Sequence, residues 1–194
     1  MSPSDGPGRT RLGDPIQHLL DEHADIMSQV VPLRRVLADL GDRREAALEG
    51  ALPVLTAVGN MMAGQLLLHA RKEDEALFPA LESIFGATGS PTVVMRAEHR
   101  EIHAGVQLYR AVLRHLDEVE HPAIVAGGER LRALTAQGGS AMELRETGAG
   151  IVQLLDLHFH KEEAILFPMA REVLDAATMA DVARAMETVA NSRG

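Results

Sequence analysis

The sequence contains no cysteine and no tryptophan, and it has only one tyrosine and four phenylalanines among its 194 residues. Without cysteine there is no disulfide framework and no thiolate chemistry, so any metal site must use nitrogen and oxygen donors. The scarcity of aromatic side chains leaves no platform on which nucleic-acid bases could stack. A formal net charge of −9 also disfavours a phosphate backbone as ligand. We therefore expect no nucleic-acid partner.

Long uninterrupted apolar runs are missing as well: none approaches the roughly 20 residues that a membrane-spanning helix requires. Residues 1–13 are rich in Pro, Gly, Ser and Arg and lack the apolar segment of a signal peptide, so they are predicted to form a flexible tail. These absences predict a soluble, cytoplasmic protein without a membrane partner. The length suits one well-packed domain better than two.

The sequence is rich in helix-forming apolar residues, which supply much of its 46% hydrophobic content. Apolar positions recur at helical spacing in four long segments. The first begins at the Asp14-Pro15 cap and ends at Gly41, and Pro32 inside it predicts a kink or a break. The second covers about residues 43–85, with a break expected near residues 50–53.

The third long segment begins at Ser90-Pro91 and runs to about residue 119, and the fourth begins at the Ser140 cap. Shorter helices are expected at 123–137 and after the capping-box-like spacing of residues 178–181. No strand pattern competes, so the predicted fold is all-α: an up-down-up-down four-helix bundle with short additional helices. The predicted bounds are a flexible tail at 1–13, the bundle at 14–175, and a short C-terminal helix and tail at 176–194.

One motif occurs twice along the chain. Residues 69–79 begin His-Ala-Arg-Lys-Glu and end Leu-Phe-Pro, and residues 158–168 begin His-Phe-His-Lys-Glu and end with the same three residues. A shorter echo precedes each copy: residues 22–26 read Glu-His-Ala-Asp-Ile, and residues 98–102 read Glu-His-Arg-Glu-Ile. The repeats predict two helix hairpins around a shared centre. They form one domain, because each hairpin alone would hold half a site.

Each copy of the motif places a histidine and a glutamate four residues apart. Positions i and i+4 lie on one face of a helix, so the imidazole and the carboxylate point the same way. A further histidine pair has this spacing, and one more histidine lies in the first echo. A lone histidine on an apolar helix face is usually a packing residue, so it is the repetition that indicates a metal site. The candidate ligands are His23, His69, Glu73, His99, His103, His158 and Glu162.

This order of ligands, with both Leu-Phe-Pro trailers, resembles that of the hemerythrin family. The chain is identified as a hemerythrin-like (HHE cation-binding) protein over residues from about 15 to 172. The resemblance implies a non-haem di-iron centre inside the bundle, with two iron ions joined by an oxo or hydroxo bridge. The implied ligands are His23 and His69 for one iron, His99, His103 and His158 for the other, and Glu73 and Glu162 as bridges.

The implied ligand set leaves room for a small molecule. Five imidazoles and two bridging carboxylates supply about nine bonds and a bridging solvent oxygen about two more, whereas two octahedral irons need about six each. One position would stay open for dioxygen, hydrogen peroxide or nitric oxide. Tyr109, six residues past His103, is expected in the core, with a hydrogen bond to the centre as the alternative.

The second copy departs from the oxygen-carrying hemerythrins, which end with His-x-x-x-x-Asp. Here His158 is followed by Glu162 at +4 and Glu163 at +5. Glu162 is the preferred bridge because it matches the first copy, and Glu163 is the alternative. Asp74 is likewise the alternative to Glu73. The longer glutamate side chain argues against reversible dioxygen carriage.

Several functions remain open for such a centre. The first is binding of a small ligand in oxygen or redox handling or in sensing. The second is an enzyme, either a catalase-like peroxide dismutase, which needs no outside electron donor, or a nitric-oxide reductase. The third is iron sensing or iron repair, although the Cys-bearing segment of iron-repair relatives is missing. A ferritin-like site would use Glu-x-x-His pairs, and a structural zinc would not need seven ligands. Monomer and homodimer both remain open.

Overall fold

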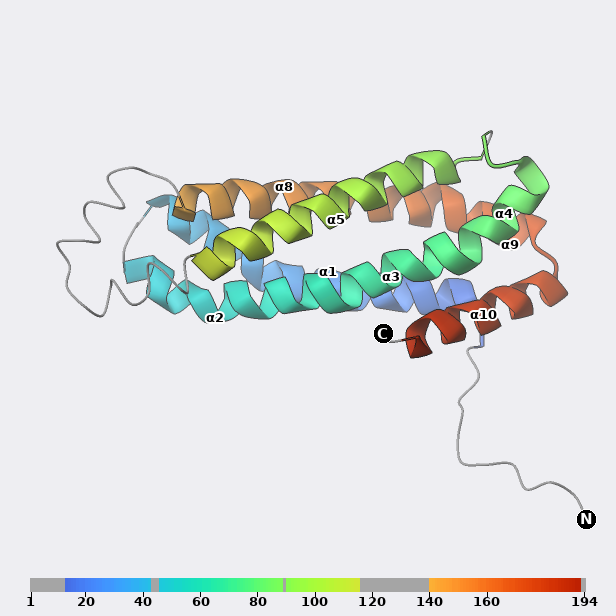
Figure 1. Cartoon of the computed structure of the whole chain (residues 1–194), viewed down its shortest axis with the longest axis horizontal. Coiled ribbons are helices and arrows are strands. Elements are labelled where there is room, and N and C mark those ends of the chain that lie inside the picture. The colour runs from blue at the N-terminus through green and yellow to red at the C-terminus, as the bar shows by residue number, and fades with distance from the viewer. Residues whose placement is uncertain (1–12, 43–45, 89, 116–139, 193–194) are drawn as a thin grey trace, which may run out of the picture.

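The computed structural model describes residues 13–42, 46–88, 90–115 and 140–192, and it contains no strand within these ranges. The long helical rods run antiparallel, and a C-terminal helix packs against them (Figure 1). The prediction of an all-α up-down-up-down bundle is confirmed. The first rod is α1 (Pro15–Asp42), and the third is α5 (Thr92–His115). The second rod joins α2 (Ala46–Met61), η1 (Met62–Leu66), α3 (Leu67–Lys72), η2 (Glu73–Leu77) and α4 (Phe78–Phe85). The fourth rod joins α8 (Ser140–Lys161), η4 (Glu162–Leu166) and α9 (Phe167–Val173), and the helix packed against the rods is α10 (Ala176–Asn191).

Short polar side chains begin several of these helices. The Asp14 carboxylate accepts a hydrogen bond from the backbone N–H of Ile16 at 2.9 Å, as its sequence predicted. The C-terminal helix begins earlier than the spacing of residues 178–181 suggested. Asp175 is its cap and accepts from the N–H of Thr178 at 2.8 Å, so Thr178 lies inside the first turn.

Neither interior proline breaks its helix. Pro32 lies within α1 and Pro53 within α2, and both helices continue past them. Pro32 and Val31 are exposed, whereas Val30 and Leu33 on the adjoining face are 0% exposed, so packing of that face outweighs the one hydrogen bond that proline removes. The breaks predicted at Pro32 and near residues 50–53 are therefore wrong, and the kink that was the alternative at Pro32 stays a prediction. The predicted tail at 1–13, apart from Gly13, and the predicted helix at 123–137 lie outside the described residues.

The apolar core forms two clusters along the bundle, with a band of buried polar residues between them. One cluster includes Ile26, Leu66 and Phe159, and the other includes Leu77 and Phe167. The second cluster also receives side chains from α10, which packs against α1, α3 and η2. The segment predicted as a separate C-terminal piece at 176–194 thus completes the cover at one end of the bundle.

One stretch of the second rod, Gly50–Phe85, is long and apolar enough to cross a membrane by length and composition alone. Polar residues interrupt this stretch, so it contains no uninterrupted apolar run that would have predicted a membrane span. A core helix of a soluble bundle passes the same test, so a single such stretch is weak evidence. This one supplies Leu55 and Leu66 to the core. The absence of a membrane partner stays a prediction.

Tyr109 lies in the core rather than at the polar band. It is 0% exposed, and its hydroxyl donates to the backbone carbonyl of Leu55 at 3.2 Å. Its ring packs between Gly59 and Gly148, where an added Cβ would lie 3.3 Å from ring atoms. We expect Tyr109→Phe to cost about 0.5–1.5 kcal/mol of unfolding free energy in urea, because one buried hydrogen bond is lost. Loss of metal from this variant would instead tie the hydroxyl to the polar band.

Candidate metal centre

Both copies of the repeated motif contain a π-helical turn that begins at the glutamate. These turns are η2 (Glu73–Leu77) and η4 (Glu162–Leu166), and each is followed directly by Phe-Pro. Proline has no N–H to donate, and its ring collides with the carbonyl four residues earlier, so the wider turn accommodates it. Such turns are frequent at functional sites. Here each sets the glutamate at the start of a widened segment facing the other rods.

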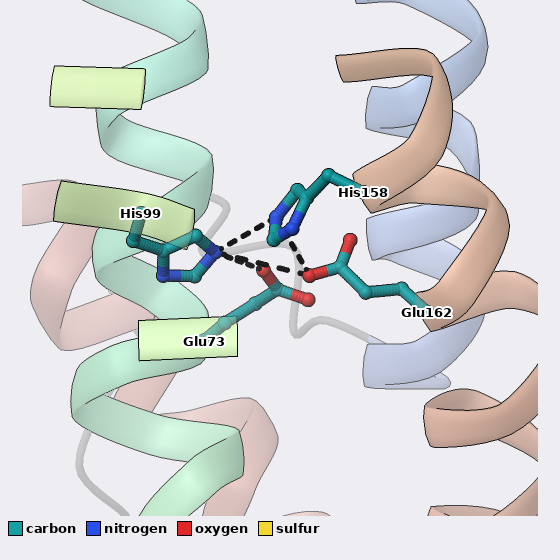
Figure 2. Close-up of side chains that lie close together, drawn as sticks. All are labelled: Glu73, His99, His158 and Glu162. Carbon is teal, nitrogen blue, oxygen red and sulfur yellow. Dashed lines mark hydrogen bonds and ion pairs between the residues drawn. The ribbon is translucent and has the colours of Figure 1, made fainter. Parts of the chain in front are cut away.

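The polar band brings together six of the seven candidate ligands. Within the described ranges, two groups of donor atoms are compact enough to hold a metal ion, with all atoms of a group within 4.8 Å of one another. Glu162 belongs to both groups, and every member is buried. Figure 2 shows the first group, whose side chains come from the second, third and fourth rods. The groups are Glu73, His99, His158 and Glu162, and His23, His69 and Glu162.

The histidines face each other in pairs. The Nε2 atoms of His23 and His69 are 3.0 Å apart, and those of His99 and His158 are also 3.0 Å apart. Glu162 reaches both pairs: its Oε2 lies 3.2 Å from Nε2 of His23, and its Oε1 lies 3.0 Å from Nε2 of His158. Oxygen Oε2 of Glu73 lies 3.3 Å from Nε2 of His99 and 3.6 Å from Nε2 of His69. Both carboxylates thus lie between the two pairs.

A carboxylate outside the centre lies within 3.1 Å of the Nδ1 atom of each histidine, in hydrogen-bond geometry at His23, His69 and His158 but not at His99. A carboxylate in this place keeps the proton on Nδ1, which leaves the Nε2 lone pair pointing inward. Two inward lone pairs 3.0 Å apart repel each other unless a proton or a metal ion lies between them. The pairs are Glu163 with His23 at 2.7 Å, Glu22 with His69 at 3.0 Å, Asp74 with His99 at 3.1 Å, and Glu98 with His158 at 2.9 Å.

The two central carboxylates are expensive to bury without positive charge. Glu73 and Glu162 are 0% exposed, and none of their four oxygens has a partner in hydrogen-bond geometry. Burial raises the pKa of Glu73, and the Glu162 carboxylate raises it further. For His99, burial works to lower the pKa, but Asp74, Glu162 and Glu73 outweigh it and raise the pKa to about 11. The site therefore requires cations among its oxygens, as protons on imidazoles or as metal ions.

The family model for the hemerythrin HHE cation binding domain matches residues 14–120 and 112–191. The chain belongs to this family. No curated protein matches the chain. The buried His/Glu cluster and the family together support a metal-binding hemerythrin-like protein.

The structure of this hemerythrin-like protein does not bring His103 to the centre. His103 is exposed on α5, one turn beyond His99, and belongs to neither donor group. Ile102 and Val106, at 1% and 0% exposure, fill the inward positions of that turn. The spacing of four places His103 on roughly the same face of α5 as His99. One turn beyond the centre, however, that face is exposed to solvent. Among the described residues the donor groups therefore contain two pairs of imidazoles, and a ligand role for His103 stays a prediction.

Asp74 and Glu163, the alternative bridges, lie in the outer layer of the hemerythrin-like centre, against Nδ1 of His99 and of His23. Glu22 and Glu98 had no predicted role, although a glutamate directly before the histidine in both echoes was a signal for them. The lysines that contact these two carboxylates were not predicted either.

Two lysines at equivalent places in the repeats hold the outer glutamates. Lys72 contacts Glu22, and Lys161 contacts Glu98. Lys72 also lies 2.8 Å from Nε2 of His18 and has a side chain only 5% exposed, against 35% for Lys161. The difference in burial accompanies α10, which packs against α3, the helix that ends at Lys72.

We expect Lys72→Ala to lower the unfolding free energy by about 1–3 kcal/mol, since Glu22 and His18 lose a buried partner. Lys161→Ala is the matched control and should cost less, because water can replace the partly exposed ammonium. Urea unfolding of the two variants measures the difference. Equal losses would show that burial by α10 does not strengthen this contact.

Proposed function

We propose that the chain holds two iron ions and binds a small ligand, dioxygen, hydrogen peroxide or nitric oxide, at an open iron position, in oxygen or redox handling or in sensing. One observation carries the proposal. Two pairs of imidazole nitrogens face each other at 3.0 Å on either side of two fully buried carboxylates. Such a donor set needs a positive charge at each of the two imidazole pairs, and a metal ion at each pair would supply it.

The residues fit two ions of the same kind. His23 and His69 would hold one ion, and His99 and His158 the other, with Glu162 offering one oxygen to each pair. Four imidazoles and two bridging carboxylates supply about eight bonds, and two octahedral ions need about twelve. The shortfall is larger than in the ligand set with His103, so more positions are left for solvent and ligand. Nitrogen-rich, cysteine-free donor sets of this kind suit iron.

The chain's own residues prepare the site for such a ligand. The outer carboxylates at His23, His69 and His158 fix the orientation of these imidazoles through Nδ1 and raise their basicity. The apolar clusters on both sides limit water and favour small, uncharged molecules. When bound, the ions would supply Lewis acidity and one-electron redox capacity to the ligand.

The alternative function is catalase-like decomposition of peroxide. The two-plus-two division of the imidazoles favours it, because positions are then open at both ions rather than at one. The reaction also needs no outside electron donor. Cytoplasmic location and the monomeric or homodimeric state stay predictions beside either function.

Metal analysis of the purified protein tests the proposal, together with its near-ultraviolet and visible spectrum through reduction, re-aeration and peroxide addition. We expect about two irons per chain and charge-transfer bands that respond to these steps. Sustained oxygen release from peroxide would favour the enzyme, and a stable adduct without turnover would favour the binding protein. One zinc per chain, or no metal after expression in iron-supplemented medium, would overturn the proposal.

A further inference from the structure

The two halves of the centre differ in how they meet the surface. His23 on α1 and His99 on α5 occupy equivalent positions of the repeats, and each has an acidic partner at Nδ1, Glu163 and Asp74 respectively. The residues three positions before the histidines are not alike. The residue three positions before His99 is Arg96, whereas the residue three positions before His23 is Leu20.

Arg96 closes the His99 side. Its Nη1 lies 3.1 Å from Asp74, and its Nε donates to Glu82 at 3.1 Å. Its guanidinium lies 5.1 Å from the centre of the Phe78 ring, and that ring stacks on His99 with centroids 5.5 Å apart. One side chain thus ties together the acid, the aromatic ring and the helix in front of this histidine.

The His23 side has a cavity instead. Its volume is about 430 Å³, and it is lined by apolar side chains such as Leu20, Ala24 and Phe159 and by polar ones, which are His23, Asp156, His160 and Glu163. Phe159 stacks on the His23 ring with centroids 3.8 Å apart. His23 therefore both lines this cavity and belongs to one of the donor groups.

The charge at the two surfaces also differs. Glu163 lines the cavity and is 46% exposed, and among the described side chains no lysine or arginine forms an ion pair with it. On the His99 side the positions equivalent to Leu20 and Ala24 are Arg96 and Arg100. A divalent cation is attracted to the Glu163 carboxylate, whereas on the other side the carboxylates of Asp74 and Glu82 are already paired with Arg96 and attract a cation less.

We propose that metal ions reach and leave the centre through the cavity beside His23 and Glu163, and that Arg96 closes the other side. The inference rests on the proposed function, because it requires that the centre binds metal ions. The ligand class is a hydrated divalent cation, which meets the Glu163 carboxylate first. His23 is then the last side chain between the cation and the buried oxygens.

The test compares metal uptake and release in two leucine variants. Ala24→Leu narrows the cavity, and Ala104→Leu places the same side chain at an exposed position of α5. Metal-free protein is mixed with Fe²⁺ without oxygen, and release is followed in excess chelator where the rate no longer depends on chelator concentration. We expect Ala24→Leu to slow both processes about tenfold, as a barrier raised by about 1.4 kcal/mol would do. Ala104→Leu should match the wild type.

A blocked passage slows uptake and release by the same factor, so the equilibrium affinity should not change. Arg96→Leu in the Ala24→Leu background should restore the rates by opening the other side. Normal rates in Ala24→Leu with a normal iron content would overturn the passage and leave the proposed function intact. Unequal effects on uptake and release would also overturn it, because they indicate altered ligands. A wild-type chain that takes up no iron overturns the proposed function and the passage together.

Discussion

Replacing Glu162 by glutamine should empty the metal centre, whereas the same replacement at Glu163 should weaken metal binding by no more than the loss of an outer partner does. Glu162 is fully buried and offers one oxygen to each histidine pair, at 3.2 Å from His23 and 3.0 Å from His158. An amide in its place removes a negative charge that both ions would share. Changing an outer partner of a ligand costs about 10–100-fold in metal affinity, and removing a bridging ligand should cost more.

Glu163→Gln is a near-isosteric control one residue away. Its amide oxygen can still accept the proton of His23 Nδ1, so only the charge of the outer layer is lost. Metal content after dialysis against a graded series of chelator concentrations measures both affinities. If Glu163→Gln loses its metal while Glu162→Gln keeps it, the bridge is Glu163, the alternative that the spacing of the second motif left open.

The sequence was sufficient for the rods because each has one continuous apolar face, and that periodicity survives local defects. It was insufficient at Pro32 and Pro53, since local propensity counts one missing hydrogen bond but not the packing on either side. The π-helical turns that begin at Glu73 and Glu162 could not be predicted from the sequence either. They depend on how a helix relieves the proline six residues further on, and spacing alone assumes a regular helix.

The same distinction applies to the centre. Repetition identified His69 and His158 because duplicated helices aim duplicated side chains at one point. It could not show that His103 lies outside both donor groups, because spacing fixes a face of one helix and says nothing of the distance to the other rods. The outer carboxylates could have been found, since Glu22 and Glu98 stand at equivalent places. The cavity beside His23 could not, because it depends on what packs around Leu20.

His99→Ala should remove metal, and His103→Ala should leave the full metal content and the melting temperature of the loaded protein unchanged. The two histidines are one turn apart on α5, but His99 is 5% exposed with its Nε2 3.0 Å from that of His158, whereas His103 is exposed. His99→Ala deletes half of one imidazole pair and leaves Glu73 with one fewer positive neighbour in the core. We expect metal binding to weaken at least about tenfold, because the loss of a ligand should cost no less than the loss of an outer partner of a ligand.

The loaded His99→Ala protein should also melt at a lower temperature, because metal that binds only the folded chain stabilises it by an amount set by its affinity. Metal analysis and thermal unfolding with and without chelator separate the two effects. After chelation the wild type should lose most of its advantage over the variant, and His103→Ala should respond to chelator as the wild type does. A His103→Ala protein that retains only one ion per chain would restore His103 as a ligand and require α5 to turn its exposed face towards the centre.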